Sequence, residues 1–469
     1  MRFAIDASVR RVGDGKVVIG GSPLKLFRLT DRGGELIDAI ERGDQIDPTA
    51  ATNLLIDRLL DAGVLHPHFG ADDNLNTADV TVIIPAFNTP AAILTRLVEE
   101  CSMASRYARV EVVIVDDASQ PPLAPVHGAR VVRREFNGGP GAARSTGLAH
   151  VTTSFVAFID TDVELIGNWL QQLLVHFADE RVGLVAPRVS SKIGANVLAR
   201  YEVAHSPLDL GPRAARVRAG TRVSYVPAAV IVCRVRALSD VGGFDDTMRL
   251  GEDVDLVWRL DEAGWRVRYE PCVTVTHRPR ASFDAWLRQR YNYGTSAAPL
   301  AARHRGALAP LRISGWSAAT WLAVAAGLPV VGGVIAASTT AMLARKLRNI
   351  PDGGREAIRL AGLGHLFASR SIASALTRAW WPMAALAALV SRRARRVVII
   401  AALAPAIIEW LRAQPDIDPL RYVGLRLLDD AAYGVGVMHG SARARSIDAL
   451  IPDLSSWPKT TTSTTSTKR

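Results

Sequence analysis

The stretch that decides the fold is residues 155–162, with the sequence FVAFIDTD. Five apolar residues are followed at once by two carboxylates, Asp160 and Asp162, which are separated by one residue. An apolar run that stops so abruptly is typical of a buried parallel strand. Ligands of open α/β sheets bind outside the carboxyl ends of such strands, and two neighbouring acids there favour a bound cation. The stretch therefore predicts a Mg²⁺ or Mn²⁺ site shared with a substrate phosphate, and the alternative is a solvated turn.

Two apolar segments upstream end in a similar way. Residues 80–88 (VTVIIPAFN) close with a proline turn, and residues 110–119 (VEVVIVDDAS) close with two acids. A helical segment over 90–107 separates them, so both strand ends should lie on one edge of a parallel sheet. Further on, residues 137–147 (NGGPGAARSTG) predict a loop whose backbone N–H groups approach an anion. Arg144, one turn into the following helix, is placed to reach a phosphate.

Two later motifs complete a recognisable order. Residues 242–246 read GGFDD, and residues 251–260 read GEDVDLVWRL. With the three segments above and the FVAFIDTD stretch, this order resembles the family-two glycosyltransferases of the GT-A fold. The resemblance implies an α/β, Rossmann-like nucleotide-diphospho-sugar transferase domain at residues 78–300. It also implies an inverting, metal-dependent transfer of a hexose, with uridine diphosphate glucose (a UDP-sugar) as the expected donor.

The resemblance assigns the donor and metal positions. A proline turn would line the uridine base, an acid after the next strand would accept from the uracil or ribose, and the acidic pair would hold ribose and metal. A histidine at the end of a later strand would add a metal ligand, although a structural histidine is the alternative. The expected positions are Pro85, Ala86 and Phe87 at the base, Asp117, Arg144 and Asp160 along the rest of the donor, and Asp160, Asp162 and His277 at the divalent cation.

The same resemblance places the catalytic base at Asp253. A sugar hydroxyl is a poor nucleophile and must lose its proton as it attacks, and one base opposite the leaving group inverts the anomeric centre. The alternative reading of Asp253 is a first-turn acid that stabilises the start of a helix. Glu252, Trp258 and Tyr291 are the expected acceptor contacts. Residues 289–293 do not match the Gln-x-x-Arg-Trp motif of processive members, which disfavours long-chain synthesis.

Residues 1–75 predict a small module of a different kind. Two strands over 17–29, a helix capped by Thr30 and a second helix from about residues 47–49 lead to a wing-like strand. This order resembles the winged-helix α+β domains that bind precursor peptides in ribosomal peptide pathways, such as that of pyrroloquinoline quinone. The implied role is to bind an extended precursor peptide along a strand edge, and the alternative is a packing domain. Polar residues 71–77 predict a linker.

Residues 301–445 predict a helical, membrane-associated region. The uncharged segment 313–344 is longer than the roughly 20 residues that a spanning helix needs. Because glycines and a proline interrupt it, both a tilted, kinked span and a re-entrant hairpin fit. Segments 379–390 and 397–411 are short for a span and enclose four arginines, which favours interfacial helices. The alternative is a soluble helical domain, and residues 446–469 predict a disordered tail.

The composition limits the partners and the compartment. Lys and Arg number 56 against 45 Asp and Glu, which gives a formal net charge of +11. The excess lies beside the apolar C-terminal segments, which argues for an anionic membrane and against nucleic acid. Cys101, Cys233 and Cys272 lack metal or redox spacing and are expected to be small buried hydrophobes in a reducing compartment. Charged residues and the lack of an apolar run at residues 1–10 place the catalytic part at the cytoplasmic face of the cell membrane.

The predicted function is therefore transfer of a hexose to a hydroxyl of a peptide-derived small-molecule acceptor, a redox cofactor built from a peptide. One alternative is a membrane glycosyltransferase that acts on a polyprenyl phosphate or a cell-wall glycan. Another, outside the enzymes, is a peptide-binding scaffold with a decayed transferase domain. The acids at positions 160, 162 and 253 are intact, which argues against decay.

Overall fold

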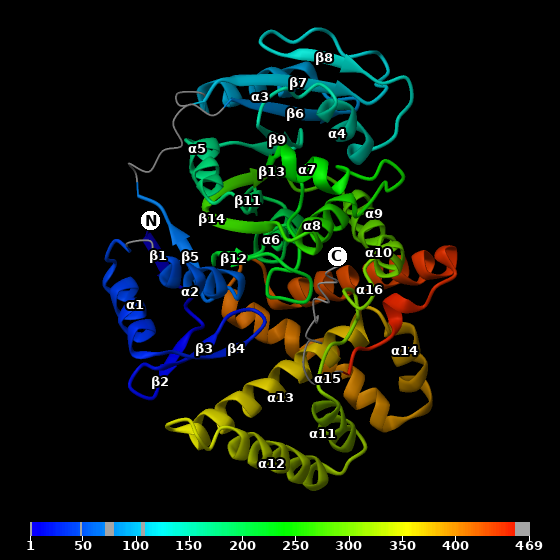
Figure 1. Cartoon of the computed structure of the whole chain (residues 1–469). Coiled ribbons are helices and arrows are strands. Elements are labelled where there is room, and N and C mark those ends of the chain that lie inside the picture. The colour runs from blue at the N-terminus through cyan, green and yellow to red at the C-terminus, as the bar shows by residue number, and fades with distance from the viewer. Residues whose placement is uncertain (1, 47–48, 71–78, 105–107, 455–469) are drawn as a thin grey trace, which may run out of the picture. The chain divides into compact units, whose positions relative to one another are not determined.

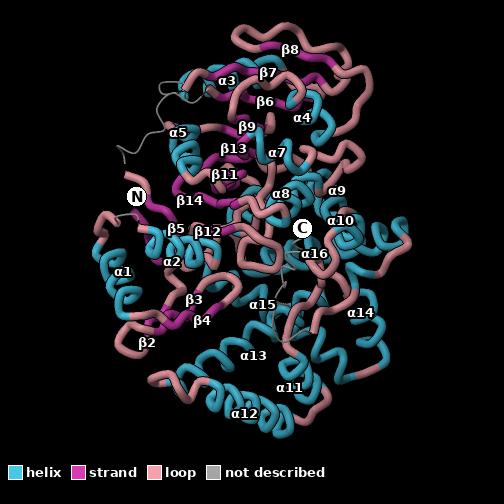
Figure 2. Tube along the Cα trace, viewed as in Figure 1, coloured by secondary structure: helices cyan, strands magenta, loops and turns pink. Residues whose placement is uncertain are grey.

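The computed structural model describes residues 2–46, 49–70, 79–104 and 108–454, which fall into two compact units (Figure 1). The first unit comprises residues 1–286 with 415–418, and the second comprises residues 287–414 with 419–469. The strands of the described chain belong to the first unit, whereas the second unit is helical (Figure 2). The predicted linker at 71–77 and most of the predicted tail lie outside the described residues.

A nine-stranded mixed sheet forms the centre of the first unit, as the α/β prediction requires. Its strand order is β10-β14-β11-β13-β9-β6-β7-β8, with β12 paired to β14. The strands β9, β6, β7 and β8 run parallel, while β13 is antiparallel to both β9 and β11. The bounds are β6 Val80–Ala86, β7 Val110–Asp116, β8 Arg130–Arg133, β9 Phe155–Ile159, β10 Val163–Glu164, β11 Val182–Ser191, β12 Ala215–Arg216, β13 Val230–Arg234 and β14 Arg266–His277.

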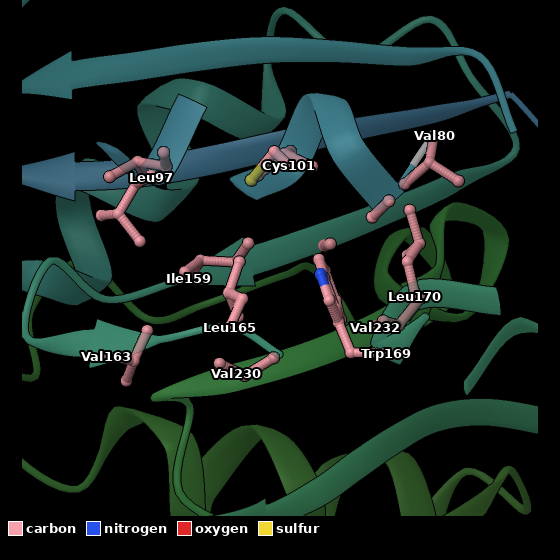
Figure 3. Packing of buried hydrophobic residues seen from close by; sticks show 14 of the residues in the cluster. Val80, Leu97, Cys101, Ile159, Val163, Leu165, Trp169, Leu170, Val230 and Val232 are labelled. Atoms are coloured by element: carbon pink, nitrogen blue, oxygen red, sulfur yellow. The ribbon is translucent and has the colours of Figure 1, made fainter. Parts of the chain in front are cut away.

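Helices cover both faces of the sheet because its central strands are apolar on both sides. On one face, Val80 of β6 packs in the cluster that contains Leu97 and Trp169 (Figure 3). On the other face, Ile83 meets the helix that contains Gly147, where an added Cβ would lie 2.5 Å from Ile83 Cγ2. The helices of this domain are α3 Ala91–Met103, α4 Pro140–Leu148, α5 Trp169–Leu174, η2 Val175–Ala178, α6 Val197–Ala204, α7 Val235–Val241 and α8 Glu252–Glu262.

The three cysteines are free, and two of them are buried as predicted. Cys101 packs in the core beside the sheet (Figure 3), and Cys233 lies on β13. The prediction is wrong for Cys272, which is exposed. Its position explains the difference, because the register between β11 and β14 shifts between Pro187 and Arg188, and Cys272 lies in the part of β14 that has no partner there.

The N-terminal module is a small α+β structure with its own core. Thr30 caps the first helix as predicted, since its Oγ1 accepts from the backbone N–H of Gly33 at 3.2 Å. Val18, Ile37, Leu59 and other apolar residues fill the space between its helices and strands. The wing-like strand pairs antiparallel with the first strand of the chain. The bounds are β1 Arg2–Ile5, β2 Arg10–Val12, β3 Val17–Gly20, β4 Lys25–Arg28, α1 Asp31–Arg42, α2 Ala50–Asp61 and β5 Leu65–His68.

One buried arginine joins this module to the catalytic sheet. Arg266, at the start of β14, is 2% exposed. Its Nη2 donates to Asp57 Oδ1 at 2.7 Å and its Nε to Asp61 Oδ1 at 2.8 Å, both on α2, while its Nη1 donates to Asp179 Oδ2 at 2.7 Å. A buried charge of this kind is tolerated only when its partners are in place. The module and the sheet therefore share a buried ion-pair contact.

The second unit is a set of helices, some of which pack tightly at glycines. Gly436 of α16 packs against α9 so closely that an added Cβ would lie 2.0 Å from the carbonyl oxygen of Tyr291. Ala297, Ala298 and Val437 belong to one small core, and Leu311 and Ala368 belong to another. The bounds are α9 Phe283–Thr295, which begins in the first unit, α10 Ala297–Arg303, α11 Gly315–Ala325, α12 Pro329–Lys346, α13 Gly353–Thr377, α14 Trp381–Val390, α15 Arg392–Ala413, α16 Pro419–Ala444 and η3 Asp448–Leu450.

The structure decides between the two predictions for residues 313–344, a kinked span and a hairpin, in favour of a hairpin. The segment forms two helices, α11 and α12, that are separated at Gly327, where φ is +83°. They pack against each other as a hairpin, since a Cβ on Gly332 would lie 2.9 Å from the carbonyl oxygen of Thr320. Across the described residues, every helix falls short of the combined length and apolarity that crossing a bilayer demands.

The glycine contact in α16 predicts a large effect of a single methyl group. Gly436→Ala should lower the free energy of unfolding of the second unit by about 1–3 kcal/mol or more, because backbone atoms of α9 cannot move aside. Gly424→Ala in the same helix is the matched control, since nothing lies within 4 Å of its added Cβ. The control should stabilise the helix by up to about 1 kcal/mol. Thermal unfolding that treats the two variants alike would contradict the packing described.

Candidate active site

The loops that follow the parallel strands β6 and β7 are tied together at the carboxyl edge of the sheet. Asn88 adopts φ +50°, donates its backbone N–H to Ser119 Oγ at 2.8 Å, and accepts from the N–H of Gln120 through Oδ1 at 2.9 Å. Phe87, immediately before it, is 52% exposed. An exposed aromatic ring on a fixed loop suits stacking on a base, so the geometry is compatible with the predicted donor turn.

Asp117 binds backbone N–H groups of the glycine-rich loop, which were predicted to approach an anionic ligand. The Asp117 carboxylate accepts from the backbone N–H groups of Gly138 at 3.0 Å and Gly139 at 2.8 Å, and it also pairs with Arg134. Gly139 has φ +88°, a left-handed conformation that favours glycine. Asp117 thus fixes the loop that precedes α4. Arg134 was not among the predicted site residues. Its position between the predicted strand at 131–132 and the glycine-rich loop could have indicated that it reaches the end of β7.

Arg144 lies at the centre of a buried charge cluster. It is 2% exposed, its Nη2 donates to Asp160 Oδ1 at 2.6 Å, and its Nη1 donates to Glu252 Oε1 at 2.8 Å. Although burial works against its charge, Asp160 and Glu252 raise the pKa of the guanidinium. The predicted phosphate contact of Arg144 is therefore not favoured, because both ends of its fork are occupied by carboxylates. Its side chain instead connects Asp160, at the end of β9, to Glu252, at the start of α8.

The acids at the start of α8 have different environments. Burial and the neighbouring charge of Asp253 raise the pKa of Glu252 to about 7, against the opposing effect of Arg144. Asp253 is half-buried, with Oδ2 accepting from the N–H of Ala228 at 3.3 Å and Oδ1 from that of Val254 at 2.8 Å. Asp253 is also the second residue of α8, so the first-turn interpretation and the catalytic one apply to the same side chain.

The predicted metal ligands are only partly brought together. His277 Nε2 lies 3.2 Å from Asp162 Oδ2, because β10 pairs with β14 and places Val163 opposite His277. Burial alone would raise the pKa of Asp162, but His277 and Arg280 lower it. Asp160 is directed to Arg144, and burial together with Asp162 raises its pKa despite that guanidinium.

No set of three metal-ligating side chains forms within the described part of the chain. Asp162 and His277 still converge as an oxygen and a nitrogen donor, a set that suits Mn²⁺. Divalent cations at diphosphate sites often take one or two carboxylates and complete their shell with phosphate and water. The residues present thus fit a cation that the donor helps to bind. The sequence reasoning missed Arg280, 3.6 Å from Asp162, although it follows His277 closely in the sequence.

Two predicted acceptor contacts have other partners in the structure. Trp258 is 3% exposed, and its indole N–H donates to the carbonyl oxygen of Ser224 at 2.6 Å. It therefore packs inside the fold, in contrast to the prediction that it binds the acceptor. The amphipathic pattern of α8 could have indicated this, because Leu256 and Leu260 are buried with it. Tyr291 belongs to the second unit, where its hydroxyl contacts His439 Nδ1.

The mixed sheet, its acidic strand end and the acidic start of α8 are the features expected of a glycosyltransferase with a GT-A-like sheet. Residues 81–240 match the profile of glycosyl transferase family 2, and the chain belongs to this family. It is 43% identical to the pre-mycofactocin glycosyltransferase of two Mycobacterium tuberculosis strains, over 96% of this chain and 97% of theirs.

Other relatives have lower sequence identity to this chain and match a smaller part of it. Glycosyltransferase AglE of Haloferax volcanii is 24% identical over 231 residues, which cover 46% of this chain and 71% of AglE. Among solved structures, a mannosyltransferase from Pyrobaculum calidifontis in complex with GDP-Man and Mn²⁺ has a TM-score of 0.43 and 18% identity. That similarity covers 83% of this chain and 94% of the mannosyltransferase.

Proposed function

We propose that this protein transfers a hexose, with glucose as the expected sugar, from a UDP-sugar to a hydroxyl of pre-mycofactocin, a peptide-derived redox cofactor. The observation that carries the proposal is the 43% identity to pre-mycofactocin glycosyltransferases over 96% of the chain, which includes both regions outside the family-2 match. A shared catalytic domain alone would support only the reaction class. Similarity along the N-terminal and C-terminal regions as well supports the same acceptor.

The proposed chemistry is a single displacement with inversion. The Asp253 carboxylate takes the proton of the acceptor hydroxyl, the hydroxyl oxygen forms a bond to the anomeric carbon, and the bond from that carbon to the diphosphate breaks. The electron pair of the broken bond leaves with UDP. The half-buried position of Asp253 and its backbone N–H contacts hold the carboxylate in one orientation. Glu252, the predicted acceptor contact, lies beside it with a raised pKa.

We assign the divalent cation to Asp162 and His277, with Asp160 nearby at the ribose. When bound, a Mg²⁺ or Mn²⁺ ion stabilises the charge on the departing diphosphate. The support is the 3.2 Å approach of the two side chains and the proximity of Arg280, whose charge would face the same phosphates.

Removing one metal ligand should weaken cation binding. Asp162→Asn should raise the Mn²⁺ concentration for half-maximal binding at least about tenfold, because a charged oxygen ligand is lost. Calorimetric titration of Mn²⁺ in the presence of UDP measures this without turnover. Glu164→Gln is the control, since Glu164 pairs with Lys192 and Arg278 instead. Equal Mn²⁺ binding by Asp162→Asn and the unaltered protein would remove Asp162 from the site.

We propose that the N-terminal module, residues 1–75, binds an extended precursor peptide at its edge strand β4. This strand pairs with β3 on one side, and both Leu26 within it and Leu24 just before it are exposed. Leu26→Asp should weaken binding of the precursor peptide in a fluorescence titration, because the apolar contact is lost. Leu54→Asp on α2 is the control, since Leu54 is also exposed but lies on a helix, which has no strand edge to pair with a peptide. Equal binding by all three proteins would argue for a packing role.

The experiment that tests the function is direct. The purified protein is incubated with pre-mycofactocin, UDP-glucose and Mn²⁺, and the products are analysed by mass spectrometry. The expected result is pre-mycofactocin with one or more added hexoses. If a folded protein adds no hexose to pre-mycofactocin from UDP-glucose or from other UDP-hexoses, the proposed acceptor is wrong.

We further propose that the reaction takes place at the cytoplasmic face of the cell membrane, as the basic, apolar C-terminal region suggests.

A further inference from the structure

Two turns that connect helices in the second unit lie side by side, and apolar side chains at both are exposed. The α11–α12 turn carries Leu328 and Val330, which are 55% and 78% exposed, and the α14–α15 turn carries Leu389 and Val390, which are 76% and 87% exposed. Arg393 at the start of α15 joins the turns, because its Nη1 donates to the carbonyl oxygen of Ala326 at 3.1 Å. Side chains this apolar are rarely left in contact with water in such a group.

Four arginines border this pair of turns. Arg392, Arg393, Arg395 and Arg396 are exposed, and Arg395 donates to the carbonyl oxygen of Ala388 at 3.1 Å. No carboxylate within the described residues forms an ion pair with any of them. Over residues 313–411 there are eleven Lys and Arg against three acids. The positive charge of the turns is thus uncompensated by the chain itself.

We propose that these turns form a docking surface for an anionic lipid bilayer, with Leu328, Val330, Leu389 and Val390 inserted among the acyl chains and the four arginines at the headgroup phosphates. Arginine is suited to this depth, since its stem packs on apolar groups while its guanidinium meets phosphate. Helices that lie in the interface need no span, which agrees with the helix lengths found. This inference deepens the membrane location proposed above and does not depend on the identity of the sugar or the acceptor.

A second copy of the chain is a poorer occupant of the same surface. A two-fold interface would bring the same four arginines of both copies together, and like charges at close range oppose association. Lipid phosphates neutralise them instead, and each basic residue near an anionic surface adds to the affinity. The observations therefore favour a bilayer over self-association.

Vesicle sedimentation of the full chain tests the docking surface. The protein should bind vesicles of phosphatidylcholine with phosphatidylglycerol, bind those of phosphatidylcholine alone more weakly, and dissociate at high salt. Arg392→Gln with Arg396→Gln should lower the affinity for the anionic vesicles about thirtyfold, from two lost basic residues. Leu389→Gln with Val390→Gln should lower the affinity for both kinds of vesicle. The matched controls are Arg355→Gln and Leu420→Gln, both exposed elsewhere in the second unit.

Two outcomes overturn the proposal. In the first, the protein fails to sediment with anionic vesicles, or the turn variants bind as the controls do. In the second, analytical ultracentrifugation without lipid shows a dimer that the Leu389→Gln, Val390→Gln variant abolishes, which would assign the surface to a second copy. Glycosyl transfer to pre-mycofactocin is measured separately without vesicles, so loss of lipid binding is distinguishable from failure of the proposed reaction.

Discussion

Asp253→Asn is expected to lower glycosyl transfer by about two to four orders of magnitude while UDP binding stays the same. General base catalysis contributes about this much, and an asparagine cannot take a proton from the acceptor hydroxyl. The substitution preserves shape, and the amide oxygen can still accept from the N–H of Val254, while the longer contact with the N–H of Ala228 is lost. Turnover is measured by release of UDP, and donor binding by calorimetry.

The control distinguishes the base from a helix-terminal acid. Removal of a first-turn charge costs the helix about 0.3–1 kcal/mol, which leaves the protein folded. Asp240→Asn, an exposed acid at the end of α7, should leave turnover unchanged. A conservative Asp253→Glu substitution keeps a proton acceptor and should retain more activity than Asp253→Asn. Near-normal turnover in Asp253→Asn would reduce Asp253 to its role in α8.

Arg144→Met should cost about 3–5 kcal/mol in the free energy of unfolding of the first unit. The methionine fills the space, but Asp160 and Glu252 lose the guanidinium that contacts both at 2.6–2.8 Å. Breaking a buried ion pair by removing one partner leaves uncompensated charge, which is the costly case. Chemical denaturation followed by fluorescence measures the loss. Arg236→Met on the surface of α7 is the matched control and should change stability little.

A second substitution tests the mechanism of that loss. If uncompensated charge is the cause, Glu252→Gln added to Arg144→Met should recover roughly 1 kcal/mol or more, because one of the orphaned carboxylates is now neutral. With Arg144 in place, Glu252→Gln should change the free energy of unfolding little at low pH, where Glu252 is already protonated because its pKa is raised to about 7. Additive losses in the double variant would mean that Arg144 stabilises the unit by its cation–π contact with Phe244, whose ring centroid lies 5.4 Å from Cζ, rather than by its ion pairs.

The strand ends were the predictable part of the site. Apolar runs that stop at polar residues mark the carboxyl edge of a parallel sheet, so Phe87, Asp117 and Asp160 could be placed at one edge from their positions in the sequence alone. The approach of Asp162 and His277 also agrees with the family resemblance, since β10 and β14 pair at those residues. These placements depend on backbone pairing, which hydrophobic patterns record well.

The partners of the charged side chains were not predictable. Arg144 was expected at a phosphate, but it pairs with the half-buried Asp160, just after β9, and the buried Glu252, at the start of α8, which are far apart in the sequence. Such pairing depends on how these distant groups come together in the fold, which no local pattern encodes. The prediction for Trp258 failed for a related reason, because an aromatic residue near the acids at the start of α8 is as suited to the core as to a sugar ring.

The helical region shows a limit of a different kind. An uncharged stretch records apolarity but not where the helix ends, so residues 313–344 fitted a span as well as a hairpin. The left-handed backbone at Gly327 decides between them, because it ends α11 and allows the chain to reverse. The glycine was visible in the sequence, whereas its conformation was not.

The contact of Arg266 with three carboxylates has a consequence for cooperativity. Because two of those carboxylates belong to the N-terminal module and the third to the catalytic domain, neither part can unfold alone without stranding the charge. The first unit should therefore melt in a single transition, and heat or protease should disrupt the N-terminal module and the catalytic sheet together. A natural substitution at position 61 or 266 would then lower the stability of both parts, including the part that does not contain it. Selection would therefore act on the two parts as one unit.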